Sequence, residues 1–223
     1  MIGIFDSGRG GLASLAIVRR ALLSVDIIYL ADRKNAPYGT KGEAEILELV
    51  ARNICVLKQL GADEILMACS TASTVFDKLK NHERVGVFPI IERTADIAAG
   101  ISTNRRVALV ATEATVKSHA YDRALKKSGA NLVLSLPLQS LVGMVERGVP
   151  RIEALGIIKS ATEKIRECGA DTLILGCTHF SYLQDMFMGE LPYIKTVDCA
   201  AAGATLMIER NRGVRERGRV VYL

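Results

Sequence analysis

The sequence predicts an α/β protein with two similar domains, whose parallel-type sheets are flanked by helices and related by a pseudo-twofold arrangement around an interdomain cleft. Short β-branched runs alternate with longer segments of helical periodicity, which is typical of parallel sheets. One pattern occurs in both halves, as Gly61-Ala62-Asp63 leading to Cys69 and Gly169-Ala170-Asp171 leading to Cys177. With 223 residues, 49% of them hydrophobic, the chain is long enough to form two small domains with sizeable cores.

The expected strands are short and follow one another along the whole chain. They cover residues 2–5, 26–30, 64–68, 85–91, 106–111, 131–135, 171–176, 194–197 and 219–223. Apolar residues at helical spacing predict helices over 41–60 and 153–168, and a glycine follows each of them. Further helices are expected at 72–80, 180–188 and 200–210.

The two domains are expected to consist of residues 1–93 with 198–223, and of residues 94–197. No Gly/Ser/Pro-rich linker separates them, so the boundary is expected in an ordinary loop near residues 91–94. After about residue 197 the chain is expected to cross back and complete the first domain.

Charge and hydropathy exclude several classes of protein. The net charge is +5, and five arginines near the carboxyl terminus contribute much of it: Arg210, Arg212, Arg215, Arg217 and Arg219. No aromatic interleaving or binding motif accompanies them, so we interpret this segment as solvated and expect no nucleic-acid partner. No apolar run of 18 residues and no secretory signal is visible, so we expect no membrane association and a cytoplasmic location.

The five cysteines form no CxxC pair, and only three histidines accompany them, so a metal site is not expected. Cys55 and Cys168 adjoin apolar helical stripes and are interpreted as core residues. Cys199 follows a strand and is interpreted as structural. Cys69 and Cys177 differ, because each follows an apolar strand and precedes a hydroxyl residue.

Such a matched pair of thiols suits a reaction in which one group removes a proton and the other returns one on the opposite face. A helix beginning after each cysteine, and a protonated His179 beside Cys177, would lower the pKa of the thiols. We therefore expect both thiols to be accessible in a cleft. The alternative is a pair of buried cysteines at strand ends, which is common for free cysteine.

Other polar residues follow the predicted strands, where ligands bind in open parallel sheets. The segment Asp6-Ser7-Gly8-Arg9-Gly10-Gly11 lacks the spacing of a dinucleotide or P-loop motif. It could hold a carboxylate through backbone N–H groups and Ser7, or it could be a tight turn with a capping Asp or Ser.

Five motifs, in order over about residues 1–200, resemble those of glutamate racemase in the cofactor-independent aspartate/glutamate racemase superfamily. They are Ile2-Gly3-Ile4-Phe5-Asp6-Ser7-Gly8, Ala36-Pro37-Tyr38-Gly39-Thr40-Lys41, Ala68-Cys69-Ser70-Thr71-Ala72-Ser73, Ala111-Thr112-Glu113-Ala114-Thr115 and Gly176-Cys177-Thr178-His179-Phe180. The resemblance implies interconversion of L-glutamate and D-glutamate without cofactor or metal, supplying D-glutamate for peptidoglycan.

The resemblance also implies site residues. Cys69 and Cys177 would be the acid/base pair, tuned by Asp6 and His179, with Asp32 and Glu146 as further acidic groups; for Glu146, solvated surface is an equal alternative. Substrate contacts would come from a mainly polar set: Asp6, Ser7, Tyr38, Gly39, Ser70, Thr71, Thr112, Thr178 and His179.

Two positions depart from the family pattern, which has Asn where this chain has Ser70 and Pro where it has Ser181. The first bears on affinity and substrate choice. The alternatives are a racemase of the same mechanism for aspartate or another small amino acid, and a non-catalytic acid-binding regulatory protein. A two-cysteine redox protein is disfavoured by the lack of CxxC. The expected partner is the small-molecule substrate glutamate, and a homodimer is left open.

Overall fold

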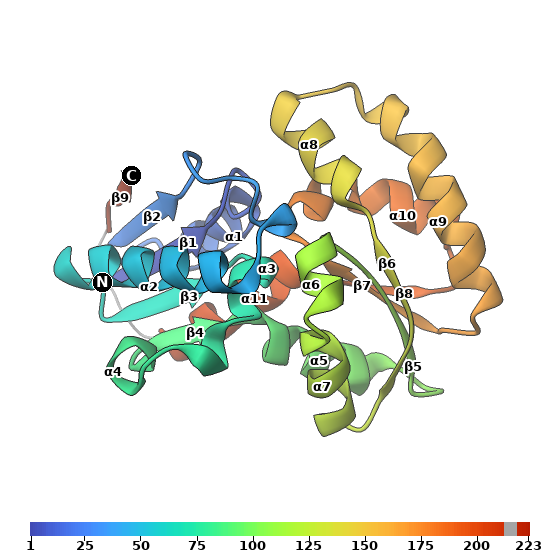
Figure 1. Ribbon diagram of the computed structural model, residues 1–223, viewed down its shortest axis with the longest axis horizontal. Coiled ribbons are helices and arrows are strands. Elements are labelled where there is room, and N and C mark those ends of the chain that lie inside the picture. The colour runs from blue at the N-terminus through green and yellow to red at the C-terminus, as the bar shows by residue number, and fades with distance from the viewer. Residues whose placement is uncertain (212–217) are drawn as a thin grey trace.

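The computed structural model describes residues 1–211 and 218–223 and contains two parallel β-sheets that lie side by side (Figure 1). The first has strand order β4-β3-β1-β2-β9 and the second β6-β5-β7-β8. The strands are β1 (Ile2–Asp6), β2 (Ile27–Ala31), β3 (Glu64–Met67), β4 (Val87–Pro89), β5 (Arg106–Ala111), β6 (Asn131–Pro137), β7 (Thr172–Gly176), β8 (Lys195–Asp198) and β9 (Val220–Tyr222). All neighbouring strands are parallel, which confirms the predicted fold class.

Helices cover both faces of each sheet. They are α1 (Leu12–Ala21), α2 (Glu43–Gln59), α3 (Ser70–Ser73), α4 (Asn81–Arg84), α5 (Ile90–Ile101), α6 (Glu113–Lys117), α7 (Ala120–Lys127), α8 (Gln139–Arg147), α9 (Leu155–Glu167), α10 (Gln184–Glu190) and α11 (Cys199–Arg210). In the first half, α2 packs on one face of the sheet and α1 with α11 on the other. In the second half, α8, α9 and α10 cover one face, and α5 and α7 the other. The central strands β1, β3, β5 and β7 are therefore buried on both sides.

The two sheets repeat one strand order. Strand β1 lies between β2 and β3, with β4 outside β3, and β5 lies between β6 and β7, with β8 outside β7. Cys69 follows β3 and Cys177 follows β7, so the two cysteines leave corresponding strands. Gly61 and Gly169, which precede these strands, have φ of 89° and 70°, a conformation that favours glycine.

The predicted loop at residues 91–94 is wrong, because these residues lie within α5. Strand β4 ends at Pro89, earlier than expected, and the helix begins at the next residue. Ile90 packs in the core of the first half, whereas Ile91 and Ala95 pack in the core of the second. One helix thus serves both cores. The domain limits at 93/94 and 197/198 stay a prediction.

A continuous helix over 72–80 is also wrong. Helix α3 ends at Ser73, and a separate 3-10 turn covers Phe76–Lys78. The Ser73 hydroxyl donates to the backbone oxygen of Cys69 at 3.0 Å, and the Thr74 hydroxyl donates to that of Thr71 at 2.7 Å. Such bonds from side chain to backbone compete with helical hydrogen bonds. Likewise, the region predicted as helix 180–188 is the 3-10 helix Thr178–Leu183 followed by α10.

The predicted helix 200–210 is confirmed as α11, and it returns to pack on α1. Arg210 forms an ion pair with Glu64, and so is not free in solvent. Arg212, Arg215 and Arg217 of the basic segment lie outside the described residues. Among the described residues, no helix is long and apolar enough to cross a membrane.

Candidate active site

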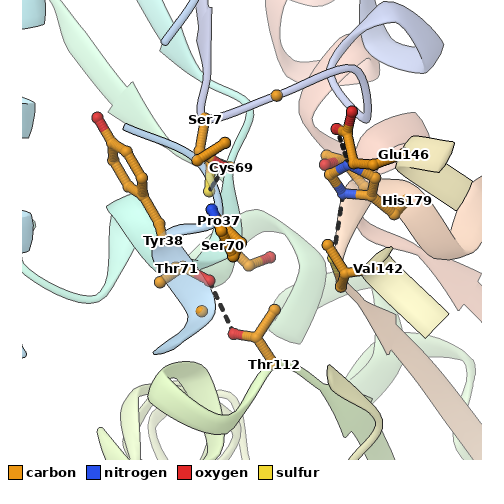
Figure 2. A pocket seen from close by; sticks show the side chains of 15 residues that line it. Ser7, Pro37, Tyr38, Cys69, Ser70, Thr71, Thr112, Val142, Glu146 and His179 are labelled. Atoms are coloured by element: carbon orange, nitrogen blue, oxygen red, sulfur yellow. Dashed lines mark hydrogen bonds and ion pairs between the residues drawn. The ribbon is translucent and has the colours of Figure 1, made fainter. Parts of the chain in front are cut away.

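A closed cavity lies where strands of both sheets end (Figure 2). The volume open to the centre of a water molecule is about 20 Å³, which is room for about one water. Its lining comes from the segments after β1, β2, β3, β5 and β7 and from α8: Ser7, Gly8, Ala36, Pro37, Tyr38, Gly39, Cys69, Ser70, Thr71, Thr112, Val142, Glu146, Cys177, Thr178 and His179.

The structure brings together nearly all of the site residues expected from the sequence. Both cysteines, His179 and Glu146 line the cavity, as do Ser7, Tyr38, Gly39, Ser70, Thr71, Thr112 and Thr178. Asp6 and Asp32 do not line it. The fully buried Asp6 lies behind Thr178, and Asp32 lies behind Tyr38. Sequence reasoning missed Gly8, Ala36, Pro37 and Val142 as lining residues.

Cys69 begins helix α3, and its Sγ atom accepts a hydrogen bond from the backbone N–H of Ala72 at 3.4 Å. Ser7 Oγ lies 3.3 Å from the same sulfur. Even so, burial raises the pKa of Cys69 to about 12, and the nearby charge of Asp6 acts in the same direction. Desolvation therefore acts against the thiolate expected at Cys69 and outweighs the effect of a four-residue helix.

Cys177 has a different partner. Its Sγ lies 3.6 Å from Nδ1 of His179, whose Nε2 lies 2.6 Å from Oε1 of Glu146. Figure 2 shows Glu146 beside His179, across the cavity from Cys69. Burial disfavours a charged ring, but the hydrogen bonds with Cys177 and Glu146 raise the pKa of His179 to about 10. A protonated His179 donates one hydrogen bond to each of these neighbours.

Glu146 lines the cavity and is half-buried rather than fully solvated. The hydrogen bond from His179 is the main cause that lowers its pKa, and the backbone N–H of Arg9 also donates to it at 2.8 Å. Arg9 belongs to the glycine-rich turn after β1. That turn therefore touches the site through its backbone.

Asp6 fixes the other part of the same turn. Its carboxylate accepts hydrogen bonds from the backbone N–H of Gly8 at 2.7 Å and from the Thr178 hydroxyl at 3.0 Å. The first contact is the capping-type turn considered as the alternative to anion binding. Burial raises the pKa of Asp6, and the charge of His179 opposes that rise. Asp6 therefore connects the ends of β1 and β7.

Tyr38 turns its ring to the cavity and its hydroxyl away from it. The hydroxyl donates to Asp32 Oδ2 at 2.6 Å, and the Asn53 amide donates to the same oxygen at 3.0 Å. Burial alone would raise the pKa of Asp32, but these hydrogen bonds and that of Asn35 hold it below its usual range. Asp32 accordingly positions Tyr38 rather than facing the cavity.

Hydroxyl groups form most of the remaining polar wall. Thr71, Thr112 and Thr115 lie within hydrogen-bond distance of one another, with Oγ1 separations of 2.8, 3.1 and 2.8 Å. Ser70 Oγ lies 3.0 Å from the hydroxyl of the buried Tyr121. No Lys or Arg lines the cavity among the described residues. Hydroxyls and backbone N–H groups are thus the available donors for a carboxylate.

The structure reverses the expected exposure of the cysteines, which had Cys69 and Cys177 accessible and Cys55 and Cys168 in the core. Cys69 and Cys177 are each only 6% exposed, although both line the cavity. Cys55 is exposed, because it lies beside the buried stripe of α2 rather than within it, and Cys168 is partly buried at the end of α9. Cys199 is fully buried in the core, consistent with a structural role.

The missed residues carry no distinctive sequence signal. Val142 belongs to the apolar side of α8 and looks like any core residue. Ala36 and Pro37 lie within a motif already identified, and their position next to Tyr38 was the available clue. Tyr121 and Asn53, which bond to site residues from outside the cavity, are distant in sequence from the residues that they support.

Comparisons with known proteins agree with this geometry. The family model described as Asp/Glu/Hydantoin racemase matches residues 16–205. A glutamate racemase from Desulforudis audaxviator is 40% identical over 207 residues, which are 90% of this chain and 75% of that protein. One from Aquifex aeolicus is 35% identical, over 91% of this chain and 80% of that protein.

Solved structures are also similar. The glutamate racemase of Francisella tularensis in complex with D-glutamate has a TM-score of 0.88 and 26% identity to this chain. The match covers 99% of this chain and 86% of that one.

Proposed function

This chain belongs to the Asp/Glu/Hydantoin racemase family, within its glutamate racemases, and we propose that Cys69 and Cys177 interconvert L-glutamate and D-glutamate by acting on opposite faces of the α-carbon. One observation carries the proposal: corresponding strands of the two sheets deliver two thiols to one cavity, and each thiol has its own hydrogen-bond partner.

The two thiols have different neighbours. The ring of His179 lies beside the sulfur of Cys177, and Ser7 Oγ lies beside that of Cys69. In each direction of the reaction one cysteine is the thiolate, which acts as general base, and the other is the thiol, which acts as general acid. For one enantiomer, Cys177 removes the α-proton, the bonding electron pair stays on the substrate, and the Cys69 thiol returns a proton to the opposite face. The other enantiomer reacts with the protonation states reversed.

Negative charge develops on the α-carbon and its carboxylate while the proton is absent. The threonine hydroxyls and the backbone N–H groups of the cavity are preorganised donors for that charge. The part of the cavity wall that the structure describes contains no Lys or Arg, which avoids a strong ion pair that would hold either thiolate inactive.

Glutamate has ten heavy atoms, and a cavity with room for one water does not hold it. The described state is therefore closed, and the two halves must separate locally for substrate to enter and product to leave. The loop carrying Pro37 and helix α8 come from different halves and both line the cavity, so movement between them would open it.

We also propose that the domains comprise residues 1–93 with 198–223 and residues 94–197, that the protein is cytoplasmic, that it can form a homodimer, and that it supplies D-glutamate for peptidoglycan. These proposals rest on family membership or on the sequence alone.

Racemisation of purified L-glutamate and L-aspartate, followed by chiral chromatography, tests the reaction. Glutamate is expected to reach an equal mixture of enantiomers while aspartate changes little. Faster conversion of aspartate would favour the alternative racemase, and no conversion of either amino acid would favour the acid-binding protein.

A further inference from the structure

A second pocket, which we call the vestibule, lies directly outside the closed cavity. Its volume is about 480 Å³, and its lining includes Arg33, Ala36, Pro37, Thr40, Gln139, Val142, Gly143, Glu146 and Arg147. Ala36, Pro37, Val142 and Glu146 also line the cavity, so they form the wall between the two spaces. The vestibule, like the cavity, is built from the loop after β2 and from α8.

Two arginines set the charge of the vestibule. Arg33 comes from the loop and Arg147 from the end of α8; both are exposed, and neither has an acidic partner in the described part of the chain. The Arg147 guanidinium folds back over its own helix, where its nearest nitrogen would lie 3.0 Å from a Cβ at Gly143. Gly143 therefore leaves room for the guanidinium to lie along the vestibule wall. Glu146 adds one negative charge to the vestibule wall, against the two positive charges of the arginines, and its Oε1 atom is engaged by His179 and by the Arg9 backbone.

Gln139 lies between the vestibule and the cavity. Its Oε1 atom is buried, has no hydrogen-bond partner among the described residues, and lies against Gly39, which lines the cavity and not the vestibule. The vestibule itself therefore offers two cations, which complement the two carboxylates of an acidic amino acid.

We propose that the vestibule captures the anionic amino-acid substrate before the closed cavity opens, with Arg147 and Arg33 attracting its carboxylates. This inference rests on the proposed function for the identity of the substrate. Within residues 1–211 and 218–223, no Lys or Arg lines the cavity, so these two cations lie outside the thiol site. A positively charged cleft raises the rate of association of an anion, and added salt weakens that effect.

Other pockets fit this role less well. The pocket lined by Arg9 and Tyr182 shares no lining residue with the cavity. The pocket lined by Lys41 and Lys117 likewise shares none, and Lys41 is paired with Glu45. Neither pocket therefore adjoins the cavity that contains the thiols.

The test uses Arg147→Gln, Arg33→Gln and the double variant, with kcat and KM measured at low and high salt. We expect kcat/KM at low salt to fall roughly 3- to 10-fold in each single variant and further in the double variant. We expect kcat to stay within about twofold, because the arginines are outside the cavity, and the loss to shrink at about 0.5 M salt. One reaction direction suffices, because enantiomers are equal in free energy and kcat/KM must be equal for both.

Two control variants remove the same charge elsewhere. Arg20→Gln lies at the end of α1 remote from the glycine-rich turn, and Lys117→Gln lies in the pocket with no wall in common with the cavity. Both are expected to retain wild-type kcat/KM. A double vestibule variant that matches the wild type at low salt, or a loss that salt leaves unchanged, would overturn the proposal.

A binding measurement keeps this test separate from the racemase reaction. Glutarate carries the two carboxylates without the α-ammonium group, and its association rate constant can be obtained from NMR line shapes. A wild-type protein that binds glutarate but does not racemise glutamate would end the proposed function alone. Equal association of glutarate with the wild type and the double variant, or no binding to either, would end the vestibule proposal.

Discussion

Nε2 of His179 lies 2.6 Å from Oε1 of Glu146, and the opposite nitrogen of the same ring faces the sulfur of Cys177. The imidazole is 4% exposed, so this contact holds a buried charge between a carboxylate and a thiol. The two pKa shifts both favour the charged forms, because the pKa of Glu146 is lowered and that of His179 is raised.

Glu146→Gln is expected to lower stability by roughly 1 kcal/mol, because it removes a charged hydrogen bond. The contribution of His179 is complete below its unfolded pKa of about 6.5 and is lost as pH rises through about 10. The contribution of Glu146 is present above about 4.5 and is lost as pH falls below that value. The melting temperatures of the wild type and of Glu146→Gln should therefore differ most between about pH 5 and 6.5 and converge toward pH 10.

The control for this experiment is Glu153→Gln, at an exposed glutamate with no ion pair in the described residues. Its melting curves should follow those of the wild type at every pH. A constant difference between Glu146→Gln and wild type from pH 4 to 10 would contradict the charged pair.

Gly39→Ala is expected to lower kcat/KM by at least about tenfold, because the new Cβ would lie 2.2 Å from Gln139 Oε1 and 2.7 Å from the Thr112 Cβ. The loop and α8 would have to move apart to admit it. Gly42→Ala, three residues later, is the matched control, since no atom lies within 4 Å of its added Cβ. Steady-state kinetics on both variants test this expectation. Equal kcat/KM values for the two variants would show that the site has room for a side chain at position 39.

Alkylation with iodoacetamide is expected to label Cys55 first in the substrate-free protein. Cys55 is exposed, whereas Cys69 and Cys177 are buried. Burial also raises the pKa of Cys69, which disfavours the reactive thiolate. Mass spectrometry of timed samples gives the order of labelling. Faster labelling of Cys69 than of Cys55 would contradict a closed cavity with a protonated thiol.

Ser70→Asn is expected to lower KM for glutamate. The amide reaches further than the hydroxyl of Ser70, which is held by Tyr121, and one hydrogen bond to a charged substrate contributes about 1.5–3 kcal/mol. Ser70→Ala removes the Tyr121 contact and adds no amide. It therefore separates the effect of losing that contact from the effect of gaining the amide. A raised KM in Ser70→Asn with the fold preserved would show that the pocket is adapted to another substrate.

The sequence was sufficient for the strands and for the residues at their ends. β-branched runs locate the strands. The polar residues that follow β1 and β3 meet at one edge of the first sheet, and those that follow β5 and β7 meet at one edge of the second, because parallel strands end at one edge. The repeat of Gly61 and Gly169 indicated two similar halves, whose strand orders correspond in the structure.

Burial and long-range contacts were not predictable in the same way. The protonation state of Cys69 depends on how tightly the two halves close around it, and local sequence carries no such signal. Helix α5 shows the same limit, because its apolar residues look alike in sequence although Ile90 and Ile91 belong to different cores. The role of Glu146 depends on His179, which is 33 residues away.

The most direct test of two thiols acting on opposite faces is to follow deuterium during the first turnovers of L-glutamate in heavy water. The returning proton comes from a second thiol that has exchanged with solvent, so new D-glutamate should carry deuterium at Cα while unreacted L-glutamate keeps its proton. Cys69→Ala and Cys177→Ala should each lose about 10²-fold or more of turnover, with the fold preserved by circular dichroism. D-Glutamate that retains the original α-proton, or near-full turnover in either variant, would contradict the two-cysteine reaction.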